Sequence, residues 1–586
     1  MRHRVFRLRR SGAFLKSYYE HVTQQKFDNI NLAITHFLKS PSPLSPNPFF
    51  LPTYYLDMNP DVATARVNPF EHFISFGEEE GRSPHPLIQI NFLPSELDRI
   101  RDAQQYTSNF GRFSRLCVRG KYLDPNPLFD TADYLSRVEF DTSKFLHPLL
   151  HYIEIGEEAG HAPGIGFSLQ DYADRYLCGS RKGALQHFFE KGHALGHHCG
   201  SSNPSQANVF AQARYAINRG FDFEETPVQV SRRPELTALA YYLPQFHREK
   251  INDAAWGTGY TEWNALAKAL PRFSGHRQPR APRDLGYYDL LAPGTIHAQA
   301  ELARGAGISV FGIYYYWMSG GQPLRKPLEL LRRDRSIDMG YCLIWANESW
   351  SRTWDGLENE LILKQDYPEG FCETLVDDWI QYFEDPRYFR VSGRPVIILY
   401  RALGIPETEQ NLNRLREALR RRTGEDLLMI AALTSEARHF AHLPLDGLIE
   451  FPPHETFNYL RPVPENRLEL FDRLFRGQVY SYDEAIKFSL TRPVLETMPL
   501  IRTAVPCWDN EPRRSGWSTL LKGSTPAKYE AWLSALVRRS EQERFLGERI
   551  VAINAWNEWA EGAYLEPDSH FGNGYLNATA RALSCI

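Results

Sequence analysis

The sequence is poor in cysteine and has no long apolar run. Its 586 residues hold seven cysteines, and no two of them form a C-x-x-C pair. Neither a disulfide framework nor a structural zinc cluster is therefore supported, and the scattered thiols are typical of a reducing compartment. No stretch of eighteen apolar residues occurs, and the N-terminus lacks the apolar core of a signal peptide. We predict a cytoplasmic protein without a transmembrane span.

An excess of charge of either sign is also missing. Lys plus Arg number 67 against 71 for Asp plus Glu, which gives a net charge of −4 and excludes a whole-protein basic field for nucleic acid. The exception is the start of the chain, MRHRVFRLRRSGAFLK, with six Lys or Arg in sixteen residues. It is predicted either to be a solvated end or to contact the inner membrane peripherally through anionic lipid.

Tryptophan usage divides the chain. All twelve tryptophans lie at or after Trp256. Proline-rich and polar stretches mark further boundaries. We predict a basic N-terminal segment with a Pro-rich linker at 1–48, a helical repeat module at 49–200, a linker at 201–235 and a catalytic domain at 236–586.

The module at 49–200 repeats one pattern three times, in which a histidine precedes an aromatic residue and glycines follow at fixed offsets. The three sets are His72/Gly77/Gly81, His151/Gly156/Gly160 and His187/Gly192/Gly196. The first copy predicts a short helix with Asn68 as its cap, Pro69 in its first turn and Gly77 as the left-handed residue after its end. The histidines are expected to be packed and hydrogen-bonded, because no second metal ligand recurs with them. The copies are expected to stack as a docking or spacing unit.

From Leu236 onward, apolar β-branched or aromatic runs alternate with amphipathic helical stretches. The eight runs lie at 236–243, 308–317, 340–347, 394–400, 427–433, 445–451, 501–506 and 549–556. Eight buried strands with helical connections predict a (β/α)8 TIM-type barrel, preceded by the mainly α-helical repeat region. A doubly wound open sheet is the alternative, but no G-x-G-x-x-G or Walker loop follows any run.

The ends of the predicted strands are rich in aromatic, carboxylate and amide side chains. In such barrels the chemistry gathers there, and a sugar needs aromatic faces beside directional hydrogen-bonding groups. The alternative is that these aromatic residues only fill a large core. The predicted substrate-binding residues are His247, Glu262, Trp263, Tyr315, Trp317, Asn347, Glu348, Trp350, Trp354, Tyr400, Trp508, Asp509, Asn510, Asn557 and Trp559.

The segment NAWNEWAEGAYLEP at 554–567 carries the predicted catalytic pair, Glu558 and Glu561. On a helical turn, residues three apart share one face with their Cβ atoms about 5–6 Å apart. Glycosidic cleavage with retention uses two carboxyl groups about 5–5.5 Å apart, one of which must hold a proton. A pair of surface glutamates at a helix start is the alternative.

Seven segments together resemble the WbsX-type glycosyltransferase family, which belongs with the glycoside hydrolase family 99-like barrels. They are YYLPQFH, GYTEW, GHRQP, WANESW, TWDG, WDNEPRR and NEWAEGAYLEP, spread over 241–567. The resemblance implies a barrel that acts on glycans in the metabolism of bacterial surface polysaccharide, O-antigen lipopolysaccharide or capsule. The repeats resemble helical repeats at the front of bacterial surface-polysaccharide proteins, which implies polysaccharide-assembly proteins as further partners.

The related hydrolases are retaining endo-α-mannosidases with an E-W-x-E motif, whose roles fall on Glu558 and Glu561 by motif position. The resemblance implies that Glu558 deprotonates the sugar's own 2-hydroxyl and that Glu561 is the acid/base. Ala560 stands where those hydrolases usually have histidine. Hydrolysis and transfer therefore both remain open, without a cofactor or metal. The alternatives are a non-catalytic glycan-binding scaffold and a sugar-nucleotide-dependent glycosyltransferase, although the sequence has neither a D-x-D motif nor a Gly-rich diphosphate loop.

Overall fold

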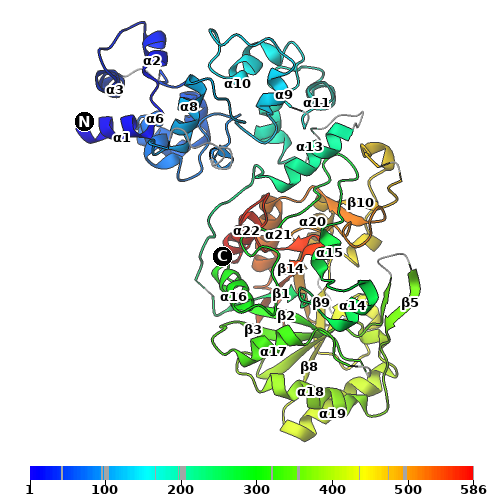
Figure 1. Ribbon diagram of the computed structural model, residues 1–586. Helices are drawn as coiled ribbons and strands as arrows, with labels where there is room; N and C mark the ends of the chain where they lie inside the picture. The colour runs from blue at the N-terminus through cyan, green and yellow to red at the C-terminus, as the bar shows by residue number, and fades with distance from the viewer. Residues whose placement is uncertain are drawn as a thin grey trace. The chain divides into compact units, whose positions relative to one another are not determined.

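The chain forms two compact units in a computed structural model (Figure 1). The structure describes all residues except 41–43, 94–96, 98–103, 165, 196, 198, 200–205, 232, 319–320, 353–356, 435, 473, 493–497 and 585–586. Unit 1 comprises Met1–Phe223 with two short later segments, Phe273–Arg277 and Glu469–Phe471, and the remaining residues form unit 2. The boundaries expected at residues 48, 200 and 235 stay predictions. No described helix is long and apolar enough to cross a membrane.

Unit 1 is helical around an aromatic core. The core takes in Phe14, Tyr19 and Phe37 from the basic N-terminal segment together with residues of all three repeats. Its helices are α1 (Arg2–Ser11), α2 (Lys16–Thr23), α3 (Ile30–Lys39), α4 (Pro52–Met58), α5 (Pro60–Ala65), α6 (Pro69–His72), α8 (Asn109–Val118), α9 (Thr131–Leu135), α10 (Pro148–His151), α11 (Leu169–Tyr176), α12 (Ala184–His187) and α13 (Gln206–Ile217). Three π-helical turns, η1 (Phe73–Gly77), η2 (Tyr152–Gly156) and η3 (Phe188–Gly192), continue α6, α10 and α12.

Each repeat histidine is hydrogen-bonded to a buried tyrosine of its own copy. The tyrosine hydroxyl lies 3.0 Å from Nδ1 of His72, 2.8 Å from Nδ1 of His151 and 2.8 Å from Nδ1 of His187. The partners are Tyr55, Tyr134 and Tyr172. The expectation of packed, hydrogen-bonded histidines is confirmed at these positions. The same pair recurs once more in the N-terminal segment, where Tyr19 contacts His36 at 3.0 Å, and the repeat pattern had not indicated it.

The glycine at offset +5 has a different role from the one expected. Gly77 is not in the left-handed region, whereas Gly81 has a φ of 72°. A Cβ atom on Gly77 would lie 2.1 Å from the hydroxyl oxygen of Tyr55. The residue must therefore be glycine because the tyrosine packs directly against its backbone. The capping prediction is confirmed, because the side chain of Asn68 accepts a hydrogen bond from the backbone N–H of Glu71.

Substitution of Gly156 by alanine tests this packing. The added Cβ would lie 2.0 Å from the hydroxyl of Tyr134, so we expect a loss of roughly 1–3 kcal/mol of stability from overpacking. Adding Tyr134→Phe removes the clashing atom, and the double variant should recover part of the loss in a thermal unfolding series. Gly166→Ala is the matched control, since its Cβ would meet Leu128 at an ordinary 3.4 Å. Equal midpoints for Gly156→Ala and the parent would contradict the packing argument.

Eight parallel strands of unit 2 close into a barrel. Neighbouring pairs run β1–β2–β3–β7–β8–β9–β11–β13 and return to β1, and every pair is parallel. The strands are β1 (Leu236–Tyr242), β2 (Val310–Tyr315), β3 (Gly340–Trp345), β7 (Arg394–Leu399), β8 (Leu428–Leu433), β9 (Gly447–Glu450), β11 (Leu500–Ala504) and β13 (Arg549–Ile553). Each falls in one of the eight predicted runs, with β11 beginning one residue earlier, so the (β/α)8 prediction is confirmed.

Helices surround the barrel, with α14 and α15 in the loop after β1, and short strands extend its loops (Figure 1). The helices are α14 (Lys250–Trp256), α15 (Glu262–Leu266), α16 (Thr295–Gly305), α17 (Lys326–Arg333), α18 (Phe371–Phe383), α19 (Thr408–Thr423), α20 (Tyr482–Thr491), α21 (Pro526–Arg539) and α22 (Gly574–Ser584). The additional strands are β4 (Trp350–Arg352), β5 (Leu357–Leu363), β6 (Arg390–Val391), β10 (Gln478–Ser481), β12 (Thr519–Lys522), β14 (Asn557–Glu558) and β15 (Ala563–Tyr564). Between β8 and β9 the described residues form only a short 3₁₀ turn, Ala437–His439.

Candidate active site

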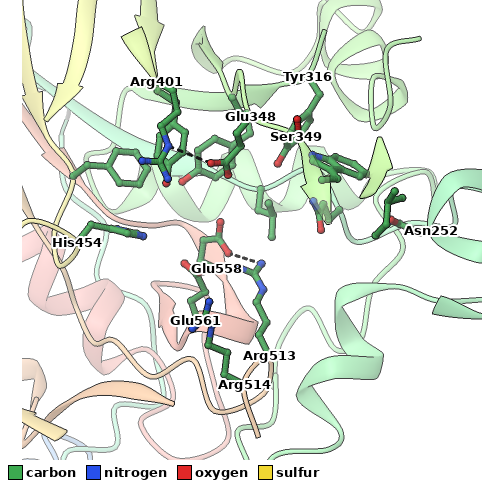
Figure 2. A pocket seen from close by; sticks show the side chains of 18 of the residues that line it. Asn252, Tyr316, Glu348, Ser349, Arg401, His454, Arg513, Arg514, Glu558 and Glu561 are labelled. Carbon is green, nitrogen blue, oxygen red and sulfur yellow. Dashed lines mark hydrogen bonds and ion pairs between the residues drawn. The ribbon is translucent and has the colours of Figure 1, made fainter. Parts of the chain in front are cut away.

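A cavity of about 490 Å³ opens where the barrel strands end at their C-termini. Glu558 and Glu561 line one side of it, and Glu348 and Arg401 lie across from Glu558 (Figure 2). Its other lining residues are Leu243, Gln245, Asn252, Trp256, Tyr314, Tyr316, Ala346, Ser349, Trp350, Ile362, Tyr400, Phe451, His454, Arg513 and Arg514. Ligand sites of (β/α)8 enzymes lie at this end of the barrel, so the cavity is the candidate active site.

A tight hairpin after β13 holds the two glutamates. Strand β14 ends at Glu558, a 3₁₀ turn runs from Trp559 to Glu561, and Gly562 follows in the left-handed region with a φ of 64°. The backbone carbonyl of Glu561 accepts a 2.6 Å hydrogen bond from the N–H of Asp509. The local sequence therefore fixes both carboxylates on one short turn, and the loop after β11 anchors that turn.

Arg513 contacts both carboxylates of the pair. Its Nη2 lies 3.1 Å from Oε2 of Glu558, and its Nη1 lies 2.6 Å from Oε1 of Glu561. The same guanidinium lies 3.2 Å from Oε2 of Glu262, which α15 contributes from the loop after β1. Only a tenth of the Arg513 side chain is exposed, so these charge-assisted contacts lie largely out of bulk water. One cation thus holds three carboxylates together.

Burial and neighbouring charges shift the pKa values of Glu558 and Glu262. Desolvation raises the pKa of Glu558 well above its usual value; Arg513 opposes that rise, while Glu561 and Glu262 add to it. Desolvation likewise raises the pKa of Glu262 against the opposing effect of Arg513. A carboxylate with a raised pKa is a stronger base than a solvated one. Glu561 is the more accessible member of the pair, with a fifth of its side chain exposed.

Aromatic side chains form the opposite walls of the cavity. Tyr314 and Tyr316 come from the end of β2, Trp350 from β4 and Tyr400 from the end of β7. The rings of Tyr316 and Trp350 meet edge to face with centroids 5.0 Å apart. Aromatic faces beside carboxylates are the arrangement that suits the C–H faces and hydroxyls of a sugar.

Three of the predicted substrate-binding residues line this cavity, namely Glu348, Trp350 and Tyr400. Glu262 lies behind it against Arg513. Trp354 lies outside the described residues. The other predicted binding residues do not line the cavity, and most of them have partners inside the protein.

At the end of β2, the residues that line the cavity are offset by one position from the predicted residue, Tyr315. Tyr315 donates a hydrogen bond to Asp378 of α18, on the helix side of the strand, while its neighbours Tyr314 and Tyr316 line the cavity. Successive side chains of a strand point to opposite faces, so a shift of one residue exchanges the two sets. Trp317 is buried in the hydrophobic core of unit 2.

Three predicted amides instead form hydrogen bonds with the backbone of neighbouring loops. Asn557 bonds the backbone of Leu243 through both its amide oxygen and nitrogen, at 2.7 and 3.0 Å. Asn347 accepts from the backbone N–H of Arg401 at 2.8 Å, and Asn510 accepts from that of Thr519 at 2.7 Å. Backbone groups left unpaired at strand ends need such partners, which explains why amides gather there.

The remaining predicted residues pack below or beside the cavity. Asp509 accepts a 2.8 Å hydrogen bond from Gln278 and lies 3.5 Å from Arg280. The buried ring of Trp508 packs against His454 with centroids 5.3 Å apart. His247 is fully buried, 3.6 Å from the carboxylate of Glu249.

Trp559 contacts a buried carboxylate, Glu566, and Trp263 packs against Trp559 with ring centroids 5.8 Å apart. Trp559 Nε1 donates to Glu566 at 2.6 Å, and its ring stacks on Tyr564 with centroids 3.8 Å apart. Trp263 donates its Nε1 hydrogen bond to the carbonyl of Tyr288 at 2.8 Å. These residues support the turn that carries the two glutamates and do not face the cavity.

The protonation of Glu566 is expected to make stability depend on pH. Burial raises its pKa from 4.5 to about 7. A raised pKa contributes stability that is present below pH 4.5 and is lost as the pH rises to about 7, by roughly 3 kcal/mol. Glu566→Gln should remove this loss, so urea midpoints of parent and variant should converge at acidic pH and differ most in the neutral range. Parallel pH curves would contradict the assignment.

The cavity residues that the sequence prediction did not select include Tyr314, Tyr316, His454 and Arg513. Tyr314 and Tyr316 were passed over for their neighbour, and His454 follows β9 in a loop without a distinctive pattern. Arg513 stands in the motif WDNEPRR that carried the family resemblance. That motif was the available signal, but nothing local says that its arginine reaches Glu558. Among the described residues, no group of three or more His, Cys, Asp or Glu could hold a metal ion.

The closed parallel barrel with its cavity at the strand C-termini defines the class, a (β/α)8-barrel protein. More narrowly, the chain belongs to the WbsX glycosyltransferase family, whose model, described as "Glycosyltransferase WbsX", matches residues 238–579. The resemblance of the helical repeats lies outside this match and stays a prediction.

Both curated proteins and proteins of solved structure are similar to this chain. The uncharacterized protein WxcX of Xanthomonas campestris pv. campestris strain B100 is 37% identical over 348 residues, covering 59% of this chain and 50% of that protein. The chain therefore spans about half the length of the curated relatives it matches. The endo-α-mannosidase of glycoside hydrolase family 99 from Bacteroides thetaiotaomicron is 14% identical, with a TM-score of 0.38, over 60% of this chain and 97% of that one. A glycoside hydrolase-like protein is 15% identical, with a TM-score of 0.38, over 62% and 99%.

Proposed function

We propose that the chain is a carbohydrate-active enzyme that cleaves or transfers glycosidic bonds with Glu558 and Glu561. The observation that carries the proposal is the pair of carboxylates on one turn, bridged by Arg513 in a cavity with aromatic walls. Enzymes that retain anomeric configuration need two such groups, one as base or nucleophile and one as acid. Membership of the WbsX glycosyltransferase family supports a glycan substrate.

The proposed roles follow the position of each glutamate. Glu558 takes the proton of the sugar's 2-hydroxyl, whose oxygen attacks the anomeric carbon as the bond to the leaving group breaks. Its raised pKa suits a base. Glu561, the more exposed of the two, gives its proton to the leaving oxygen. It then takes a proton from the incoming water or sugar hydroxyl, whose oxygen attacks the anomeric carbon and opens the anhydro-sugar. Glu558 returns its proton to the 2-oxygen as the bond between that oxygen and the anomeric carbon breaks.

Surface polysaccharide, as O-antigen lipopolysaccharide or capsule, is the proposed substrate class, and an α-mannoside-like unit is the proposed sugar. The motif resemblance supports both. The helical repeats are proposed to contact other proteins of polysaccharide assembly. Ala560 is buried within the catalytic turn and presents no imidazole. The position at which the related hydrolases carry histidine thus differs, which supports transfer as an alternative outcome to hydrolysis.

Sugar-nucleotide-dependent transfer is the second candidate. The family name supports it, and so does Arg514, an exposed cation at the cavity to which no described residue is ion-paired. An arginine in this position could meet a diphosphate. A glycan-binding scaffold without catalysis is the third reading.

Product analysis separates these candidates. The protein is incubated with oligosaccharides released from bacterial surface polysaccharide, with and without nucleotide sugars. New reducing ends or transglycosylation products without a nucleotide sugar support the two-glutamate enzyme. Products that require the nucleotide sugar support the second candidate, and binding without any product supports the scaffold.

The two-glutamate mechanism predicts that activity survives chelation. Carboxylates and the substrate's own hydroxyl supply every proton transfer, so no divalent ion is required. Turnover should be unchanged after dialysis against EDTA, with a metal-dependent nuclease in the same buffer as the control for complete chelation. Loss of turnover that a divalent ion restores would overturn this mechanism.

A further inference from the structure

Helix α1, Arg2–Ser11, has one face that packs and one that does not. Leu8 and Ser11 are buried. On the same side, Arg4 binds the carboxylate of Glu71, and Arg7 donates to Oγ of Ser75 in η1 at 2.8 Å. With 3.6 residues per turn, the opposite side presents four other residues. They are Arg2, Phe6, Arg9 and Arg10, which we call the basic face.

Every member of the basic face is exposed, and none of the described residues neutralises its charges. Phe6 is 59% exposed, a high value for an aromatic side chain. Among the described residues, none forms an ion pair with Arg2, Arg9 or Arg10, and the Arg10 guanidinium lies 6.0 Å from the ring centroid of Phe6. Three cations thus surround one exposed ring.

Two elements that pack against α1, helix α3 and the turn η1, add no negative charge. Helix α3, INLAITHFLK, and the turn η1, FISFG, contain no aspartate or glutamate. The neighbouring carboxylate of Glu71 is already paired with Arg4. Phe76 of η1, next to the Ser75 that Arg7 contacts, is also 55% exposed. The basic face itself is therefore cationic and partly aromatic, and the acidic residues nearest to η1 in sequence, Glu78, Glu79 and Glu80, follow directly after it.

We propose that the basic face docks the protein on an anionic lipid bilayer. Guanidinium groups bind lipid phosphates through charge-assisted hydrogen bonds, and an aromatic side chain enters the headgroup region. A nucleic acid would satisfy the arginines alone, whereas the bilayer accounts for the exposed ring at their centre. This inference does not depend on the proposed function of the barrel, although it would bring a glycan-active site to a membrane surface.

Vesicle co-sedimentation of the full-length chain tests the proposal. Vesicles of phosphatidylcholine with one third phosphatidylglycerol should bind the protein, and pure phosphatidylcholine vesicles should not. The triple variant Arg2→Gln/Arg9→Gln/Arg10→Gln should bind on the order of 100-fold more weakly, because each arginine near an anionic surface contributes a factor of roughly five. Phe6→Ser should weaken binding by roughly tenfold, through lost apolar burial. All four substitutions are at exposed positions without ion pairs, so thermal unfolding should match the parent.

The control removes three positive charges elsewhere. Arg420, Arg421 and Arg422 are exposed on α19, and their triple glutamine variant should bind anionic vesicles as the parent does. Three outcomes would overturn the proposal. The first is that the protein does not bind anionic vesicles. The second is that the Arg420/Arg421/Arg422 variant loses as much vesicle binding as the Arg2/Arg9/Arg10 variant. The third is that Phe6→Ser binds anionic vesicles as the parent does while single-stranded DNA competes for the protein as well as the vesicles do.

Discussion

Glu558→Gln and Glu561→Gln variants are expected to fold like the parent and to lose about 10²–10⁴-fold in turnover. The amide is nearly isosteric with the carboxylate, and its oxygen can still accept a hydrogen bond from Arg513, which contacts Glu558 at 3.1 Å and Glu561 at 2.6 Å. The loss therefore reports proton transfer and not packing. The two losses should be non-additive, because groups that act as a unit fail together.

A substrate with an activated leaving group distinguishes the two roles. Such a leaving group departs without protonation, so Glu561→Gln should cleave it far better than a natural glycoside. Glu558→Gln should gain nothing, since the attack itself depends on its base. Glu348→Gln is the matched control, because this carboxylate lines the same cavity and pairs with Arg401 at 3.2 Å. Near-parental turnover by either folded variant of the pair on a confirmed substrate would end the assignment.

Arg513→Gln is expected to move the acidic limb of the pH profile of kcat/KM towards higher pH. Arg513 holds down the pKa of Glu558, which burial raises. Without the cation that pKa rises further, because nothing then offsets the desolvation and the neighbouring carboxylates. A base must be ionised to act, so more alkaline conditions are needed. On the acidic limb, the activity at a given pH should fall about tenfold for each pH unit by which the limb moves.

The pH profile separates this effect from a structural one. Loss of a buried ion-pair partner also destabilises a protein, by about 3–5 kcal/mol in comparable cases. A merely structural role for Arg513 would lower activity at every pH without moving the limb. Arg514→Gln is the control, because this exposed neighbour lines the cavity without an ion pair to either glutamate of the pair, and its profile should coincide with that of the parent.

Much of the barrel was predictable because its signals are local. Each strand is a short apolar run bounded by polar residues, and parallel strands buried on both faces need such runs. The placement of Glu558 and Glu561 on one turn was predictable for the same reason, since they lie three residues apart. The packed repeat histidines followed from the absence of a second recurring ligand.

The sequence prediction of the binding residues failed where the role of a side chain depends on a partner far away in the chain. Tyr315 was preferred to Tyr314 and Tyr316 because the sequence does not state which face of β2 meets the cavity. The strand-end pattern predicts Asn557 and Asn347 as ligands of a sugar, but both are hydrogen-bonded to backbone groups, of Leu243 and Arg401 respectively. Polar side chains at strand ends serve either purpose, and only the packed structure shows which backbone groups need them.

By itself, the sequence determined the eight strands, the helical module and the pair of glutamates, because hydrophobic periodicity and short spacings are local properties. Only the tertiary structure decided that Arg513 bridges that pair and Glu262, which the chain separates by 251 residues. It also decided that Gly156 must accommodate the hydroxyl of Tyr134. The physical reason is common to both: charge pairing and close packing depend on distances in space, which closure of the barrel and stacking of the helices set.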